Sequence, residues 1–297
     1  MSDPVQIFDR HALRLHRDRA AARLVDHDFL FRETADRLAD RLLDITRRFP
    51  RALNLGCHGG EMAEALVGRG GIEHIVHTDL SEVLARRAGG VAVDEEFLPF
   101  AEHSFDLVVS NLSLHWVNDL PGCLAQIRRI LKPDGLLLAT LFGGDTLIEL
   151  RRAWMEAELA EEGGVSPRVA PFADVRDLGG LLQRAGFALP VADSESLTVS
   201  YPDAMRLMAD LRGMGESNAG AARRKTFTRR ATLFGLVNAY ERLFAQPDGR
   251  LPATFQLITL TAWSPHASQQ QPLKPGSGQV SLAEFIANDR PLRDQPP

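Results

Sequence analysis

A glycine-rich turn between an apolar run and a helical stretch is the feature that most limits the fold. Residues 52–55 (ALNL) are predicted to form a buried parallel strand, residues 56–60 (GCHGG) form the turn, and residues 62–66 continue with helical spacing. Glycine has no Cβ and tolerates positive φ, so such a turn lets backbone approach a ligand at the unpaired N–H groups of the following helix. The spacing differs from the dinucleotide fingerprint G-x-G-x-x-G, and a tight turn without a ligand is the alternative interpretation.

An acidic residue ends the next predicted strand. Residues 74–79 (HIVHTD) finish at Asp79, at the roughly 20-residue interval where such folds place the carboxylate that binds the ribose hydroxyls. The competing role is capping of the following helix, for which Ser81 is a second candidate. We predict that Asp79 binds a ribose.

Composition limits the class of protein. Of the 297 residues, 44% are hydrophobic and 25% are charged, which is typical of a globular protein with a full core. The net charge of −5 gives no support to a nucleic-acid partner. Two cysteines, Cys57 and Cys123, favour a reducing compartment. No apolar run approaches the 18 or so residues of a membrane span, and the first residues lack a signal peptide's apolar region, so we expect a cytoplasmic protein.

Predicted strands and helices alternate along the first half of the chain, which indicates a doubly wound, mostly parallel α/β sheet. The clearest strand is residues 105–110 (FDLVVS), and the polar and aromatic stretch 111–119 (NLSLHWVND) follows it. Asp94 and Glu95 come directly after another short apolar piece, at the sheet edge where ligands bind in open α/β folds. One of them is expected to accept from an adenine amino group, and a charged turn is the alternative.

The order of these pieces resembles the class I S-adenosylmethionine-dependent methyltransferases, over residues 50–145 and the last strand. The first loop of that family usually reads D/E-x-G-x-G-x-G, and here Asn54 stands for the acid and His58 for the middle glycine. The resemblance implies a seven-stranded Rossmann-like sheet with a mainly helical insertion before the last strand, and S-adenosylmethionine as cofactor. The residues that it implies for cofactor binding are Asn54, Gly56, Cys57, His58, Gly60, Asp79, Leu80, Asp94, Glu95 and Asn111.

Four longer strings resemble the respiratory complex I assembly factor 5 family. They are residues 94–100 (DEEFLPF), 112–121 (LSLHWVNDLP), 142–147 (FGGDTL) and 213–218 (GMGESN). In that family the methyltransferase fold serves complex I assembly, and the mitochondrial member is held to hydroxylate an arginine of the quinone-site iron–sulfur subunit. The resemblance implies a complex I subunit as protein substrate, and a bacterial protein that is cytoplasmic or peripheral at the inner membrane.

Five segments follow from the pattern and the resemblance together. Residues 1–49 are an N-terminal arm and helix, and the Arg- and His-rich part up to residue 32 is expected to be a solvated arm rather than a lid. Residues 50–145 are the S-adenosylmethionine-binding core, and residues 146–250 are a helical substrate subdomain with part of the sheet. Residues 251–263 form a last, antiparallel strand, and the polar residues 264–297 are expected to be a disordered tail.

Three residues are candidates for catalysis. His115 follows the fourth strand at the sheet edge and is our candidate base, with packing or capping beside Trp116 as the alternative. Asp145 and Glu216 lie in strings that match the family, so they are candidates to hold a guanidinium group by charge-assisted hydrogen bonds; helix capping competes. Two H-x-D spacings, at residues 16–18 and 77–79, are assigned to no metal site.

Three functional hypotheses remain at this point. The leading hypothesis is an enzyme that modifies an arginine of a complex I subunit. The second is a methyltransferase for a small or carrier-bound acid, as in biotin synthesis. The third is a non-catalytic assembly chaperone, which agrees with the altered glycine loop.

Overall fold

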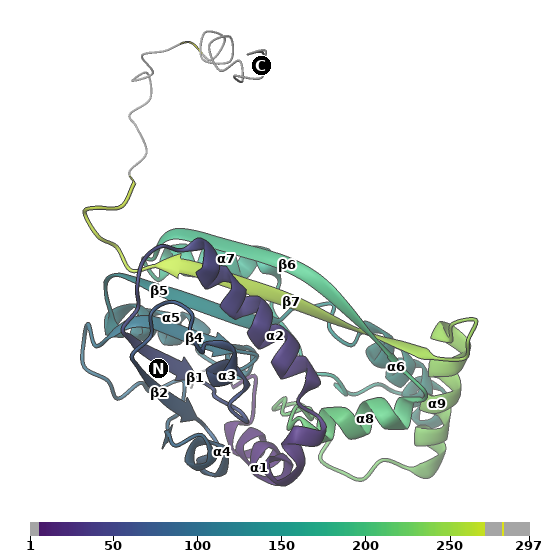
Figure 1. Ribbon diagram of the computed structural model, residues 1–297. Helices are drawn as coiled ribbons and strands as arrows, with labels where there is room; N and C mark the ends of the chain where they lie inside the picture. The colour runs from purple at the N-terminus through teal and green to yellow at the C-terminus, as the bar shows by residue number, and fades with distance from the viewer. Residues whose placement is uncertain (1–5, 271–280, 282–297) are drawn as a thin grey trace, which may run out of the picture. The chain divides into compact units, whose positions relative to one another are not determined.

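One mixed sheet organises the part of the chain that the structure describes. The computed structural model describes residues 6–270 and residue 281. Seven strands lie there in the order β3-β2-β1-β4-β5-β7-β6 (Figure 1), parallel from β3 to β5, with β7 antiparallel to both of its neighbours. This confirms the predicted doubly wound, mostly parallel seven-stranded sheet. The strands are β1 (Arg51–Leu55), β2 (His74–Asp79), β3 (Val91–Ala92), β4 (Phe105–Asn111), β5 (Leu131–Phe142), β6 (Ala188–Tyr201) and β7 (Leu251–Trp263).

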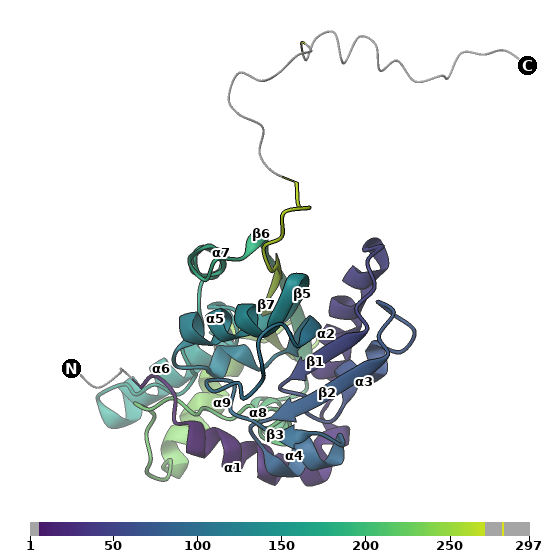
Figure 2. The same cartoon turned by 90° about the vertical axis from the view of Figure 1, so that its left-hand side faces the viewer.

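Helices cover both faces of this sheet (Figures 1 and 2). Because successive side chains of a strand point to opposite faces, β4 contributes to two cores. Leu107 and Val109 pack with α2 and α3, whereas Val108 packs with α5 and α7. The helices are α1 (Arg10–Ala20), α2 (Phe29–Asp40), α3 (Glu61–Ala65), α4 (Glu82–Arg87), α5 (Leu120–Ile130), α6 (Ile148–Glu162), α7 (Val175–Arg184), α8 (Ala204–Gly213) and α9 (Arg230–Phe244), with short 3-10 turns at Ala21–Asp26, Arg41–Asp44 and Leu114–Trp116.

Strands β6 and β7 run beyond the rest of the sheet towards α6, α8 and α9 (Figure 1). A buried cluster there joins Trp154 of α6, Leu207 of α8, Leu236 of α9 and Phe255 of β7. The pattern predicts two short strands where β6 is in fact continuous. The polar residues 193–196 stay in register with β7, because β6 is an edge strand and its outward side chains can face solvent.

The N-terminal residues correct the expectation of a solvated arm. Asp9 caps α1 by accepting from the backbone N–H of Ala12, and Leu13 and Arg17 of the helix are fully buried. The buried face of α1 is difficult to recognise in the sequence, because the segment is rich in arginine and one arginine, Arg17, lies on that buried face.

The described residues up to 265 form one unit that holds all of these elements. In the second unit, His266 Nδ1 and Ser268 Oγ lie 2.7 Å apart, and most of the predicted tail falls at 271–280 and 282–297, outside the described residues. Within the ranges that the structure describes, no helix is both long enough and apolar enough to span a membrane.

Candidate functional site

The glycine turn, residues 56–60, packs against Ser113 at its first residue, Gly56, and has free space beside its last residue, Gly60. The backbone N–H groups of Gly56 and Cys57 both donate to the Thr78 carbonyl, at 2.8 Å. Gly56 has φ +78°, and a Cβ there would lie 2.3 Å from the Ser113 side chain. Gly60 has φ +106°, and a Cβ there would meet nothing within 4 Å. The turn therefore needs glycine at Gly56 for space and leaves room for a ligand at Gly60.

His58 fills part of the space between the ends of β1 and β4. It adopts φ +48°, a left-handed conformation that histidine tolerates better than most residues, and its ring stacks on Phe31 with centroids 4.1 Å apart. Nε2 lies 2.9 Å from the Asn111 carbonyl oxygen, which can only accept, so Nε2 carries the proton. Burial lowers the pKa of His58, so the ring is neutral and Nδ1 is a bare acceptor.

Asp79 ends β2 fully buried, with its carboxylate turned towards the glycine turn. It accepts from the backbone N–H groups of Ser81 at 2.8 Å and His58 at 3.1 Å. The side chain of Ser81, not that of Asp79, caps α4 by accepting from Leu84. This removes the capping alternative for Asp79 and leaves its carboxylate as part of the sheet edge.

Two arginines of α1 reach the acidic residues of this edge. Arg17 Nη1 lies 3.3 Å from Asp79 Oδ1 and 3.4 Å from Glu95 Oε1, and Arg17 Nη2 donates to Ser113 Oγ at 3.0 Å. Arg10 donates to Asp94 at 2.7 Å and also pairs with Glu95. Glu95 is therefore fully buried against α1, whereas Asp94 pairs with α1 and stays partly exposed.

Electrostatics hold this network in its charged form. Burial alone raises the pKa of Glu95, but the charges of Arg10 and Arg17 outweigh it and bring that pKa to about 2. Burial likewise opposes the charge of Arg17, yet Asp79 and Glu95 raise its pKa above the ordinary value. Glu95 and Arg17 therefore stay ionised in spite of their burial because each lies beside groups of opposite charge.

Buried polar atoms without a hydrogen-bond partner among the described residues gather around the same edge, and such atoms usually bind water or a polar ligand. They belong to Arg17 (Nε), Asn54 (Oδ1), His58 (Nδ1), Asn111 (Oδ1), His115 (Nδ1) and Glu216 (Oε1). These donors and acceptors therefore fit a nucleotide with polar groups. For the nucleotide to reach Asp79 and Glu95, Arg17 would have to release some of its contacts with them.

A second cluster adjoins this edge and is built on Glu216. The Glu216 carboxylate accepts from Trp116 Nε1 at 2.7 Å and lies 3.2 Å from His115 Nε2. Burial lowers the pKa of His115, so its Nε2–H donates to Glu216 and its Nδ1 is a bare acceptor. The hydrogen bond with His115 and the charge of Arg17 overcome the effect of burial, so the pKa of Glu216 stays below its ordinary value.

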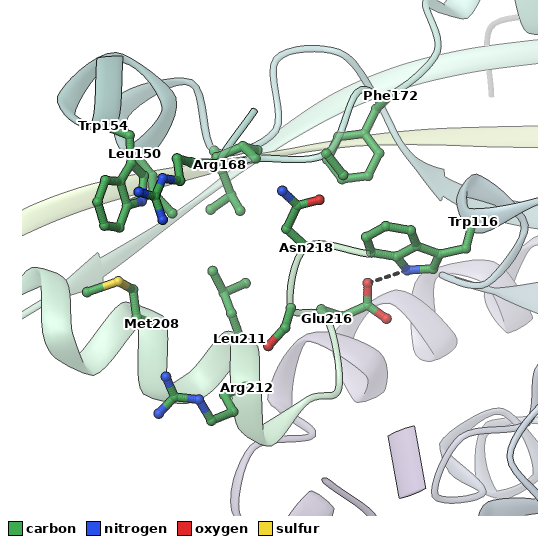
Figure 3. Close-up of a pocket in the computed structure, with 14 residues that line it drawn as sticks. Trp116, Leu150, Trp154, Arg168, Phe172, Met208, Leu211, Arg212, Glu216 and Asn218 are labelled. Carbon is green, nitrogen blue, oxygen red and sulfur yellow. Dashed lines mark hydrogen bonds between the residues drawn. The ribbon is translucent and has the colours of Figure 1, made fainter. Parts of the chain in front are cut away.

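Glu216 and Trp116 close one end of a cavity of about 200 Å³, and Trp154 and Leu150 lie at the other end (Figure 3). Between them the wall combines apolar side chains, among them Phe172, Leu211 and Met208, with polar ones, among them Arg212 and Asn218. Arg168 contributes its guanidinium, which lies 4.6 Å from the centre of the Trp154 ring. The cavity thus joins aromatic surface to one buried carboxylate.

The remaining predicted site residues are placed as follows. Asn54 Nδ2 lies 3.3 Å from His77 Nδ1, and Asn111 Nδ2 donates to the Phe31 carbonyl at 2.8 Å. Leu80 packs on the cluster of Phe8 and Trp116. Cys57 is buried, which raises the pKa of its thiol. Asp145 is exposed and does not line the cavity with Glu216. It does not cap α6 either, because that helix has no side-chain cap.

Sequence reasoning missed Arg10, Arg17 and the aromatic wall formed by Trp154 and Phe172. A signal for Arg17 was present, since it lies four residues after Leu13 and three before Ala20, on the buried stripe of α1. The aromatic wall had no such signal, because it is assembled from separate loops and helices.

Comparisons with known proteins agree with this geometry. Residues 26–190 match the model of the methyltransferase domain. The chain is 43% identical over 300 residues to "Arginine-hydroxylase NDUFAF5, mitochondrial" of Danio rerio, covering 98% of this chain and 93% of that protein. It is 35% identical over 287 residues to malonyl-[acyl-carrier protein] O-methyltransferase of Halorhodospira halophila, covering 93% and 95%. A solved phosphoethanolamine N-methyltransferase 2 of Haemonchus contortus shares the fold, with TM-score 0.53, 16% identity, and coverage of 86% of this chain and 60% of that one.

Proposed function

Because this chain is a methyltransferase-fold enzyme that belongs to the methyltransferase-domain family together with the mitochondrial arginine-hydroxylases, we propose that it binds S-adenosylmethionine and modifies an arginine of a respiratory complex I subunit. The substrate is proposed from the activity for which these relatives are named and from the chemistry of the Glu216 cavity. The proposal for the cofactor draws on the residues at the carboxyl edge of the sheet.

The cofactor would lie along the turn from Gly56 to Gly60, with Asp79 for its ribose and Asp94 or Glu95 for its adenine. The unpartnered polar atoms at this edge support a polar ligand there. When bound, S-adenosylmethionine supplies an electrophilic methyl group. The residues around it position the reacting groups and exclude water.

The single observation that carries the substrate proposal is the carboxylate of Glu216 at the end of an aromatic cavity. One oxygen is bonded to Trp116, while Oε1 has no hydrogen-bond partner among the described residues. A guanidinium suits this setting, because its N–H groups bind carboxylates and its planar cation stacks on aromatic rings. We therefore assign Glu216 to hold the substrate arginine.

His115 is then the proposed base. Its Nε2–H is fixed by Glu216, which orients the ring, and Nδ1 is left as the proton acceptor. Methylation of a guanidinium nitrogen forms an N–C bond and releases one N–H proton, and the neutral ring of His115 would accept that proton.

A carrier-bound acid is a second candidate, because of the malonyl-[acyl-carrier protein] O-methyltransferase relative and because Arg212 lines the cavity. The buried carboxylate of Glu216 would repel an acid at the end of the cavity, which favours arginine. Methyl transfer to malonyl carrier protein in vitro would reverse this preference.

The test is peptide mass spectrometry of complex I subunits from a deletion strain complemented with wild type, Asp79→Ala, Glu216→Gln or Glu161→Gln. We expect one arginine to lose its modification in the deletion strain and to regain it with wild type and Glu161→Gln only. Glu161→Gln is the control, because that residue is exposed on α6. Full arginine modification in the deletion strain would refute the proposal, and normal complex I levels with Asp79→Ala would favour the chaperone hypothesis.

A further inference from the structure

We infer that α1 is an internal occupant of the nucleotide site, so that Arg17 and S-adenosylmethionine compete for Asp79 and Glu95 and nucleotide binding releases α1. The inference rests on the proposed cofactor and adds a regulation of the same site. It starts from the position of one side chain.

Arg17 is fully buried among the groups assigned to the nucleotide. Its guanidinium contacts Asp79, Glu95 and Ser113 at 3.0 to 3.4 Å. Asp79 already accepts from Arg17 and from two backbone N–H groups, on Ser81 and His58. A ribose that donates two hydroxyl hydrogen bonds to Asp79 therefore has to replace Arg17.

Charge gives a second reason for exclusion. S-adenosylmethionine carries a sulfonium and an ammonium, and Asn54 stands where the fold usually provides an acid for such a cation. Arg17 adds a buried positive charge beside Asp79 and Glu95. Like charges in a buried site disfavour each other, so the cofactor and the docked Arg17 do not share it.

The same helix supports the loop that carries Glu216. Gly215 has φ +79°, and a Cβ there would lie 3.2 Å from the Arg17 Cα, so this loop packs directly on α1. The backbone N–H of Asp9 donates to the Ala219 carbonyl at 2.7 Å. Release of α1 would therefore loosen the loop that carries Glu216.

Calorimetric titration of S-adenosylmethionine into wild type, Arg17→Ala and Arg14→Ala tests the competition. Arg14 lies on the same helix but is exposed. We expect Arg17→Ala to bind S-adenosylmethionine at least about tenfold more tightly than wild type, because no arginine has to leave Asp79 and Glu95 before the nucleotide binds. Arg14→Ala should bind with the wild-type affinity. Equal or weaker binding by a folded Arg17→Ala would overturn the inference.

Amide hydrogen exchange of wild type keeps the inference testable if Arg17→Ala does not fold. S-adenosylmethionine should speed exchange in residues 10–20 and in residues 213–218, whereas slower exchange in α1 would identify a lid that closes over the cofactor and would overturn the inference. If no folded variant binds the nucleotide, both the competition and the proposed cofactor fail. If Arg17→Ala binds more tightly but no arginine is modified in cells, the competition stands and the proposed function fails.

Discussion

The two halves of the site differ in how they are filled. At the nucleotide edge, the chain's own cations already pair with the acids: Arg17 with Asp79, and Arg10 with Asp94 and Glu95. In the substrate half, a cavity of about 200 Å³ remains, and Glu216 has one oxygen without a partner among the described residues. In the first half the acids are already paired with the chain's own arginines, whereas the second half is hollow and keeps one carboxylate oxygen without a partner among the described residues.

This difference teaches that an acidic residue at a sheet edge does not by itself make an open binding site. The same carboxylate can hold a ligand in one state and the protein's own arginine in another.

Arg17→Met should cost the most stability. It leaves Asp79 buried without its cationic partner, and breaking a buried ion pair costs about 3–5 kcal/mol. Urea unfolding at neutral pH measures this loss. Arg14→Met on the exposed face of α1 is the control and should change stability by less than about 0.5 kcal/mol; equal effects of the two substitutions would mean that α1 is not held by the nucleotide-edge acids.

Glu61 should make the nucleotide edge sensitive to pH. Burial raises the pKa of Glu61 from 4.5 to about 7. Between pH 4.5 and pH 7, Glu61 is therefore protonated in the folded state and ionised in the unfolded state. Stability should therefore be highest below pH 4.5 for this group and fall by about 3 kcal/mol as pH rises through 7.

Glu61→Gln should abolish that fall, as measured by urea unfolding from pH 5 to pH 8. Glu102→Gln, at an exposed position, should leave the wild-type pH profile unchanged. A Glu61→Gln profile identical to that of wild type would contradict the assignment.

Glu216→Gln should weaken the substrate half without affecting the nucleotide half. A hydrogen bond to a charged group contributes about 1.5–3 kcal/mol, so turnover of an arginine peptide should drop about 10- to 150-fold. S-adenosylmethionine affinity should be unchanged by calorimetry. A parallel loss of nucleotide affinity would show that the two halves are not separate.

Trp154→Leu should have the smallest effect. It removes one aromatic wall of the cavity and the partner of Arg168, and such cation–π contacts contribute about 0.5–1 kcal/mol at partly exposed sites. KM for the arginine peptide should rise about fivefold with kcat kept. A larger fall in kcat would place Trp154 among the groups that act on the reacting atoms.

The sheet could be predicted from sequence because its signals are local. Apolar runs end at glycine or at an acid, as at Gly56 and Asp79, and the alternation with helices sets the order of strands. The length of β6 could not be predicted, because its polar residues depend on pairing with a distant strand.

The site was only partly predictable for the same reason. Asp79, Glu95 and Glu216 follow from spacing or from family strings, and the structure brings each to the sheet edge or the cavity. Arg17 was missed, because a run of arginines is typical of a solvated surface and only the stripe that includes Leu13 distinguishes one of them. Asp145 shares a family string with the site, but its side chain remains exposed.

A crystal structure with bound S-adenosylhomocysteine would test the central claim most directly. The account predicts the ribose on Asp79, with the Arg17 guanidinium displaced from both Asp79 and Glu95. A nucleotide bound elsewhere, or bound at this edge with the contacts of Arg17 to Asp79 and Glu95 intact, would contradict it.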